Sequence, residues 1–262
     1  MTQLNKIAIS GKGGVGKTTL AALLAHIYAG QGRSVIAIDA DPAGGLAEAL
    51  GFPADLVAQV TPVAAMEELI YERTGARPGT SGGFFTINPR VDDIPDRFSV
   101  SHEGIRFLRL GTIESGGSGC ICPESALLRA LVTHLLLYRS EMLILDMEAG
   151  VEHLGRATAR AVDAFLVVVE PGRRSLATAE RIRELAADIG VSRVYAVGNK
   201  VRGESDWAFI QAGRSVPVLG YLSANPELTE ADLQGEGVFD AAPRAVEEAL
   251  AIAAALEALE SG

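Results

Sequence analysis

Residues 11–19 carry the pattern of a loop that binds phosphate groups. The stretch reads Gly-Lys-Gly-Gly-Val-Gly-Lys-Thr-Thr and directly follows the apolar segment 7–9. In the pattern G-x-x-x-x-G-K-[ST], glycines let backbone N–H groups surround phosphate oxygens, the lysine reaches the β- and γ-phosphates, and the hydroxyl binds Mg²⁺. The sequence therefore predicts a site for ATP or ADP with Mg²⁺, and hydrolysis of ATP. The residues expected to form it are Gly11, Gly13, Gly14, Val15, Gly16, Lys17, Thr18 and Thr19, with Lys17 catalytic and Thr18 the Mg²⁺ ligand.

The same glycines also satisfy a weaker pattern, the dinucleotide fingerprint G-x-G-x-x-G. Gly11, Gly13 and Gly16 match it, and Asp39 supplies an acidic residue about 20 positions further on. A dinucleotide loop has no use for the Lys-Thr-Thr run at 17–19. We therefore favour the phosphate loop over a dinucleotide loop and over a simple glycine-rich turn.

Carboxylates follow two further apolar segments. Asp39 and Asp41 come after the first, at the sheet edge where the phosphates should lie. We expect Asp39 to help bind the nucleotide and Asp41 to orient the water that attacks the γ-phosphate. Asp146 ends the apolar run 142–145, where an aspartate reaches Mg²⁺ directly or through water. Gly150 follows, and a glycine there lets a backbone N–H approach the γ-phosphate and lets the loop rearrange on hydrolysis. Each carboxylate alone is more often a turn or cap residue, but their joint placement favours a role in the site.

Lys12 is one lysine more than the phosphate-loop pattern requires. With K-G-G-V-G-K-T the sequence resembles the deviant Walker A ATPases, the class that contains MinD, ParA, the nitrogenase iron protein and related metallochaperones. The resemblance implies that Lys12 is catalytic, crosses the interface of a homodimer and contacts the phosphates held by the partner chain. The alternative is a solvated charge on a loop.

The resemblance also implies a position for the adenine base. Asn199 and Lys200 match the place where members of this class recognise adenine through an asparagine amide, which both donates and accepts hydrogen bonds. By the same analogy, the segment 222–226 closes over the base, although an asparagine before a proline is ordinarily a turn.

Cys120 and Cys122 are the only cysteines of the sequence. Their spacing disfavours a disulfide between them, so we interpret them as thiols. Two thiolates are half of a tetrahedral metal shell, and a twofold dimer supplies the other half. Pro123 and Glu124 begin a helix, whose N-terminus favours a thiolate. The alternative is an ordinary pair of buried or capping cysteines.

The C-x-C motif narrows the resemblance to the CooC-type ATPases, the nickel-insertion accessory proteins of carbon monoxide dehydrogenase. The resemblance implies a homodimer with Ni²⁺ or Zn²⁺ at a bridging four-cysteine site, and the apoprotein of carbon monoxide dehydrogenase as a partner. The segment 55–101 matches this family least. The residues that carry the resemblance are 11–19, 39–42, 116–122, 146–154, 169–171 and 199–202.

Two other functions compete with this one. An iron–sulfur scaffold ATPase would use the same thiols, because four thiolates suit Zn²⁺ or an iron–sulfur cluster, whereas Ni²⁺ often prefers square-planar ligands. A partitioning or positioning switch like ParA or MinD would bind DNA or membrane. The net charge of −10 opposes that reading, since DNA and anionic lipid would be repelled. We therefore expect neither a nucleic acid nor a membrane partner.

The composition predicts a single domain over residues 1–262. With 262 residues, 48% hydrophobic and 21% charged, the chain can bury a large core. We find no signal peptide and no apolar run of the roughly 18 residues that a membrane span requires, so we expect a cytoplasmic protein.

The elements that must position these residues alternate between strand and helix. Short, continuous apolar runs are typical of strands covered on both faces, so we predict an α/β fold with a mainly parallel, doubly wound sheet, helices on both faces, and ligands at its carboxyl edge. The predicted strands are 7–9, 34–38, 105–110, 142–145, 165–169, 194–197 and 216–219. The predicted helices are 17–29, 122–138, 175–189 and 242–259, and 73–83 is predicted to be a surface loop.

Overall fold

A single sheet organises the part of the chain that the structure, a computed structural model, describes: residues 4–79, 84–111, 122–151, 154, 158, 160–213 and 216–259. Its strand order is β3-β4-β2-β5-β1-β6-β7-β8. All neighbouring strands are parallel except β3 and β4, which confirms the mainly parallel sheet predicted from the sequence. The strands are β1 (Lys6–Gly11), β2 (Val35–Ala40), β3 (Val100–His102), β4 (Ile105–Arg109), β5 (Met142–Met147), β6 (Ala164–Val169), β7 (Val194–Val201) and β8 (Val218–Ser223).

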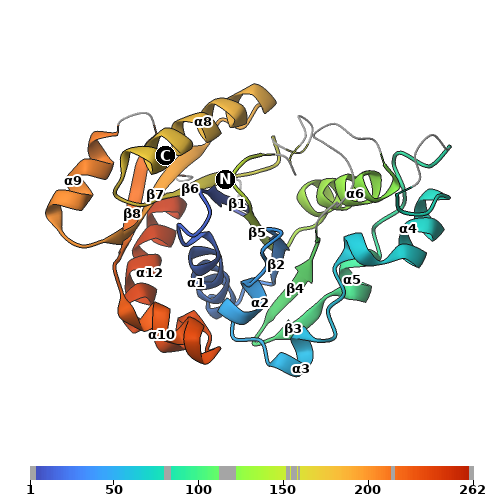
Figure 1. The fold of residues 1–262 in the computed structure, drawn as a ribbon, viewed down its shortest axis with the longest axis horizontal. Helices are drawn as coiled ribbons and strands as arrows, with labels where there is room; N and C mark the ends of the chain where they lie inside the picture. The colour runs from blue at the N-terminus through green and yellow to red at the C-terminus, as the bar shows by residue number, and fades with distance from the viewer. Residues whose placement is uncertain are drawn as a thin grey trace.

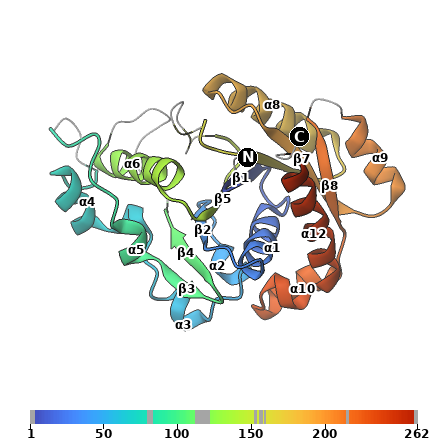
Figure 2. The same ribbon diagram turned by 180° about the vertical axis from the view of Figure 1, so that it is seen from behind.

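Helices follow most of the strands and cover both faces of the sheet (Figures 1 and 2). The longer ones are α1 (Lys17–Gly30), α4 (Glu67–Thr74), α6 (Pro123–Tyr138), α8 (Arg173–Ile189), α9 (Glu204–Ala212), α10 (Pro226–Gln234) and α12 (Pro243–Ala258). The short ones are α2 (Leu46–Ala49), α3 (Ala54–Val57), η1 (Val63–Ala65), α5 (Ile94–Phe98) and α11 (Val238–Ala241).

Alternate strand residues face two separate hydrophobic clusters. Ile7 and Ile9 of β1 pack with α1 and α12, whereas Ala8 belongs to the cluster that contains α6 and α8. Figure 1 shows α1 beside α12 in the lower half of the view and α6 and α8 in the upper half. Because successive side chains of a strand point to opposite faces, a strand buried on both sides must be apolar at every position. The continuous apolar runs of the sequence have this cause.

The structure differs from the sequence prediction mainly at element ends and in short elements. β8 begins at Val218, two residues later than predicted, and continues to Ser223. Helix α8 begins at Arg173, before the predicted Ser175. The region between residues 46 and 102 contains several helices of four or five residues, and these are too short to display a helical period in the sequence.

The carboxyl ends of the parallel strands meet at one edge of the sheet. Asp39 at the end of β2 is the register partner of Asp146 at the end of β5, which lies between β2 and β1. The chain leaves β1 at this same edge and enters the phosphate loop. In the described part of the chain, no helix has both the length and the apolar character needed to span a membrane.

Candidate active site

Residues 11–16 lead from the end of β1 to α1, and the backbone conformations of Gly11 and Gly16 favour glycine. Gly11 has φ +150°, and a Cβ there would lie 2.6 Å from the carbonyl oxygen of Val168. Gly16 has φ +100°, and a Cβ there would lie 1.9 Å from Nδ2 of Asn199. Gly16 also caps α1 without a side-chain hydrogen bond, so the first N–H groups of the helix are left for an anion.

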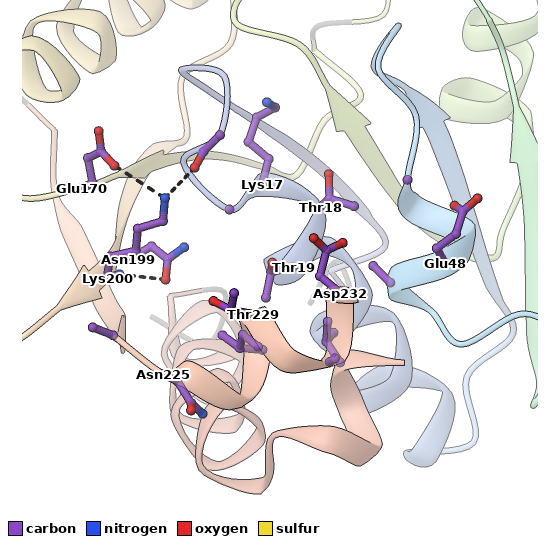
Figure 3. A pocket seen from close by; sticks show the side chains of 18 of the residues that line it. Lys17, Thr18, Thr19, Glu48, Glu170, Asn199, Lys200, Asn225, Thr229 and Asp232 are labelled. Carbon is purple, nitrogen blue, oxygen red and sulfur yellow. Dashed lines mark hydrogen bonds and ion pairs between the residues drawn. The ribbon is translucent and has the colours of Figure 1, made fainter. Parts of the chain in front are cut away.

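A cavity of about 980 Å³ opens beside this loop, which is a size typical of sites for small molecules and cofactors (Figure 3). Its walls come from the segments that follow β1, β2 and β6, from the ends of β7 and β8, and from helices α1, α2, α10 and α11. The lining residues include Gly13, Gly14, Gly16, Lys17, Thr18, Thr19, Asp41, Glu48, Glu170, Asn199, Lys200, Asn225, Thr229 and Asp232. Val15 does not line it, because its side chain is buried in the core.

Lys17 is a buried cation that points into this cavity. Its side chain is 6% exposed, and Nζ lies 3.2 Å from Oδ2 of Asp41. Asp41 follows β2 in a loop, and its other carboxylate oxygen accepts a hydrogen bond from the backbone N–H of Ala43. The structure thus brings together the two predicted catalytic residues Lys17 and Asp41.

Thr18 and Asp146 form the pair that suits a hydrated Mg²⁺ ion. The Thr18 hydroxyl donates to Oδ2 of Asp146 at 2.7 Å, while Oδ1 of Asp146 is buried without a hydrogen-bond partner. Burial raises the pKa of Asp146 to about 7, and the nearby Asp39 carboxylate also raises it. A hydroxyl beside an unpartnered, shielded carboxylate oxygen fits the oxygen ligands that Mg²⁺ requires.

Asp39 does not line this cavity, and its role in binding the cofactor stays a prediction. Its side chain is buried, and Oδ2 lies 3.5 Å from Nε of Arg109 on β4. Burial raises the pKa of Asp39 to about 6, against the charge of Arg109, which lowers it. A Cβ at Gly44 would lie 3.1 Å from Arg109. The pair therefore supports the loop that carries Asp41. The pairing of Arg109 with Asp39 could not be predicted, because nothing in the sequence shows that β4 lies beside β2.

Asn199 and Lys200 hold the phosphate loop by two successive carbonyl groups. Asn199 Nδ2 donates to the carbonyl oxygen of Val15 at 2.7 Å. Lys200 Nζ donates to the carbonyl oxygen of Gly14 at 2.7 Å (Figure 3). The Oδ1 atom of Asn199 accepts from the backbone N–H of Lys200, which has φ +57°. The Asn199 amide is thus engaged with protein on both sides, whereas the resemblance assigned it to adenine.

Two other predicted residues do not line the cavity. Lys12 is half-exposed and lies 3.8 Å from Glu170 of its own chain. Gly150 does not line the cavity, and its backbone N–H donates to the Ser10 hydroxyl on β1 at 3.1 Å. Ser10 in turn donates to the carbonyl oxygen of Glu148, so β1 holds the loop after β5.

The far side of the cavity comes from the segment after β8. Residues 223–226 line it, and Asn225 caps α10 by accepting from the N–H of Glu227. The closure of this segment over the adenine base stays a prediction. Thr229 and Asp232 also line this side, and neither belongs to a motif that the sequence shows. The Asn225-Pro226 pair was the available signal, since both residue types are typical of a helix start.

Of the C-x-C motif, Cys122 lies within the described residues and Cys120 lies outside them, as do residues 116–119. Cys122 is buried and is the N-cap of the 16-residue helix α6. Among the described residues, no group of three or more His, Cys, Asp or Glu side chains is arranged to hold a metal ion.

A second cavity of about 600 Å³ lies between the nucleotide side and α6. Asp41, Ala43 and Gly44 line both cavities, and the second one is also lined by Arg109 and Glu124. Glu124 is buried and accepts from the backbone N–H of Gly79. The loop after β2 thus lies between the phosphate site and the start of α6.

The model of the CobQ/CobB/MinD/ParA nucleotide-binding domain matches residues 6–238. The chain belongs to this family. It is 45% identical, over 96% of its length and 95% of the relative's, to the carbon monoxide dehydrogenase accessory protein CooC of Rhodospirillum rubrum. It is 44% identical, over 89% of its length and 90% of the relative's, to an ATP-binding protein of Methanocaldococcus jannaschii. This member of the CobQ/CobB/MinD/ParA family is therefore an ATPase that uses ATP with Mg²⁺.

Solved structures of a MinD protein and of a plasmid partition protein share the fold of this family member. MinD of Aquifex aeolicus aligns over 98% of this chain and 97% of its own, with a TM-score of 0.64 and 19% identity. A plasmid partition protein of Borrelia burgdorferi bound to AMPPNP aligns over 98% and 100%, with a TM-score of 0.68 and 13% identity. At these identities the comparison confirms the predicted fold but carries no argument about function, which depends on the residues of the site.

Proposed function

We propose that the chain is an ATP-hydrolysing metallochaperone, which dimerises in response to nucleotide and metal and supports nickel insertion into carbon monoxide dehydrogenase. The observation that carries this proposal is the 45% identity, along nearly the whole chain, to a protein named as an accessory of that enzyme. The residues of the site and the C-x-C motif support the finer steps.

The proposed chemistry assigns one task to each residue of the phosphate site. Lys17 and the N–H groups at the start of α1 bind the phosphates, with Lys17 exchanging Asp41 for the anion. Thr18 and Asp146 hold Mg²⁺, which neutralises charge on the phosphates when bound. Once released from Lys17, Asp41 orients the attacking water. Lys12 of the partner chain contributes a positive charge to the transition state.

The proposed cargo is a metal ion held by cysteines of two chains. Cys120 and Cys122 of each chain supply two thiolates, and a homodimer supplies four around Ni²⁺ or Zn²⁺. Cys122 at the N-terminus of α6 is suited to this task, because a helix N-terminus stabilises a thiolate. The recipient is the apoprotein of carbon monoxide dehydrogenase, in the cytoplasm.

The cavity shared by the loop after β2 and α6 supports a link between nucleotide and metal. Asp41 contacts Lys17 on one side, and the same loop faces Glu124 across the second cavity. Glu124 stands two residues after Cys122 on α6. A shift of Asp41 on binding ATP therefore changes the surroundings of α6, the helix that Cys122 caps. If ATP and ADP bind with different affinity to the two positions of Asp41, this difference in binding free energy drives the change at the metal site.

Oligomeric mass and metal content test the proposal together. We expect light scattering to show a dimer with ATP and Ni²⁺ or Zn²⁺, and elemental analysis to find one metal ion for two chains. The variant Cys120→Ala/Cys122→Ala is expected to lose metal-dependent dimerisation while binding ATP as the wild type does. A single-chain mass under every combination of nucleotide and metal would contradict the proposal.

Two further measurements separate the proposal from its competitors. A visible chromophore after anaerobic reconstitution with iron and sulfide would indicate an iron–sulfur scaffold. Salt-dependent retention on DNA in the presence of ATP would indicate a partitioning switch. We expect neither, and we expect apo-carbon monoxide dehydrogenase to gain activity with nickel only when the chain hydrolyses ATP.

A further inference from the structure

Glu170 lies between two lysines that reach it from different elements. Oε1 of Glu170 is 3.8 Å from Nζ of Lys12, and Oε2 is 3.8 Å from Nζ of Lys200. This proximity follows from the sheet itself, because Gly11 is the register partner of Val168 in the pair β1 and β6. The chain after β1 and the chain after β6 therefore leave the sheet side by side, which brings residues 12 and 170 together.

The backbone of Glu170 is held in place, whereas its side chain is partly exposed. Its N–H donates to the hydroxyl of Ser175 at 3.0 Å, and Ser175 is buried at the start of α8. Pro171 follows and restricts the backbone of residue 170 to extended conformations. The side chain of Glu170 remains about one-third exposed, so its carboxylate can exchange partners without a change in the fold.

The two lysines differ in how firmly they are held. Lys200 also donates to the carbonyl oxygen of Gly14, so it stays anchored to the phosphate loop when Glu170 moves (Figure 3). Lys12, in contrast, forms an ion pair with Glu170 and with no other residue in the described part of the chain. Lys12 is therefore the partner whose position depends on Glu170.

We propose that Glu170 is the positioning residue of Lys12. In the single chain it holds Lys12 at the rim of its own phosphate loop, and formation of the two-chain site requires Lys12 to leave it. The inference rests on the proposed action of Lys12 across a dimer. Ion pairs between partly exposed side chains contribute little free energy, so Lys12 can leave Glu170 when a second chain binds.

The first test measures dimerisation in ATP for the variant Glu170→Gln. Loss of the ion pair between Lys12 and Glu170 is expected to lower the dimer dissociation constant. The expected change is about fivefold for each of the two Glu170 side chains replaced, equivalent to about 1 kcal/mol each. The matched control is Glu180→Gln, which removes the same charge from an exposed position on α8 and is expected to change nothing. Thermal unfolding checks that both variants are folded.

A double-mutant cycle shows whether the effect passes through Lys12. In a Lys12→Ala background, Glu170→Gln is expected to leave the dimer dissociation constant unchanged, because the hold has already been removed. An equal shift in both backgrounds would overturn the inference, since Glu170 would then act by repelling the phosphates directly. No shift in the wild-type background would overturn it as well.

A second test is independent of dimerisation and separates this inference from the proposed function. In the nucleotide-free single chain, acylation of the Lys12 amine, followed by peptide mass spectrometry, is expected to be faster in Glu170→Gln than in the wild type or in Glu180→Gln. Equal rates would show that Glu170 does not hold Lys12. If wild-type chains fail to dimerise but the labelling rates differ, the proposed dimer step fails while the contact stands.

Discussion

The hydroxyl of Thr18 lies 2.7 Å from Oδ2 of Asp146, on the strand next to β1 and at a depth that solvent does not reach. The second oxygen of this carboxylate has no hydrogen-bond partner, and burial raises the pKa of the group to about 7. An ionised carboxylate in such a place is costly unless a cation compensates it. A Mg²⁺ ion bound beside this carboxylate would supply that compensating charge.

Mg²⁺-dependent ATP binding is therefore expected to weaken below pH 7. Protons compete with Mg²⁺ for Asp146, so the apparent affinity for Mg²⁺ with ATP should fall by up to about tenfold for each pH unit below the pKa. Isothermal titration between pH 5.5 and 8 measures this. In Asp146→Asn the Mg²⁺ dependence should be lost at every pH, and a pH profile identical to that of the wild type would refute the assignment.

The stability of the nucleotide-free chain is expected to follow the opposite trend. The folded pKa of Asp146, about 7, lies above its ordinary value of 3.8, so the folded state binds the proton more tightly. This contribution to stability is fully present below pH 3.8 and is lost as the pH rises through 7. We expect Asp146→Asn to be more stable than the wild type at pH 8, by on the order of 2 kcal/mol. Urea denaturation at pH 5 and pH 8 checks the difference, which should shrink at the lower pH.

The hydrogen bond from Asn199 to Val15 leads to a prediction about the phosphate loop. Asn199→Ala removes that support, and the affinity for ATP and ADP should fall about tenfold, while adenosine, which lacks phosphates, should be affected much less. Gly16→Ala should abolish nucleotide binding, because its Cβ would meet the Asn199 amide at a residue with φ +100°. Competition with a fluorescent nucleotide measures both, and an adenosine affinity that falls as far as that of ATP would instead place the Asn199 amide against the base.

The contrast between Lys17 and Asp39 shows what the sequence could predict. Lys17 and Thr18 lie within one local motif, so their place at the start of a helix is fixed by adjacent residues, and the structure confirms it. Asp39 follows an apolar run just as Asp146 does, and the sequence treats the two alike. Only the strand order, which puts β4 with its Arg109 beside β2, distinguishes them. An ion pair between neighbouring strands depends on the order of the strands in the sheet, and a local sequence pattern does not contain that order.

Arg109 is expected to matter for stability more than for nucleotide binding. Arg109→Met leaves the carboxylate of Asp39 buried without its cation, which should cost on the order of 2 kcal/mol, since Arg109 itself is about one-quarter exposed. The double variant Asp39→Asn/Arg109→Met should recover most of the loss, because no charge is then left unpaired. Urea denaturation at pH 8 measures all three variants, and additive losses in the double variant would argue against the pair.

Lys12 leads to the prediction that bears most directly on the proposed mechanism. Its side chain is half-exposed and pairs with Glu170, and it does not line the cavity, so Lys12→Ala should bind ATP with an affinity within about twofold of the wild type. If Lys12 acts on the phosphates of the partner chain, turnover should nevertheless fall by about a thousandfold, as for an arginine supplied in trans. The ATPase rate per chain should also rise with chain concentration in the wild type, because two chains are needed. Steady-state ATPase assays over a range of chain concentrations check both expectations. A wild-type rate per chain that is independent of concentration, or an undiminished rate in Lys12→Ala, would restrict hydrolysis to the single chain.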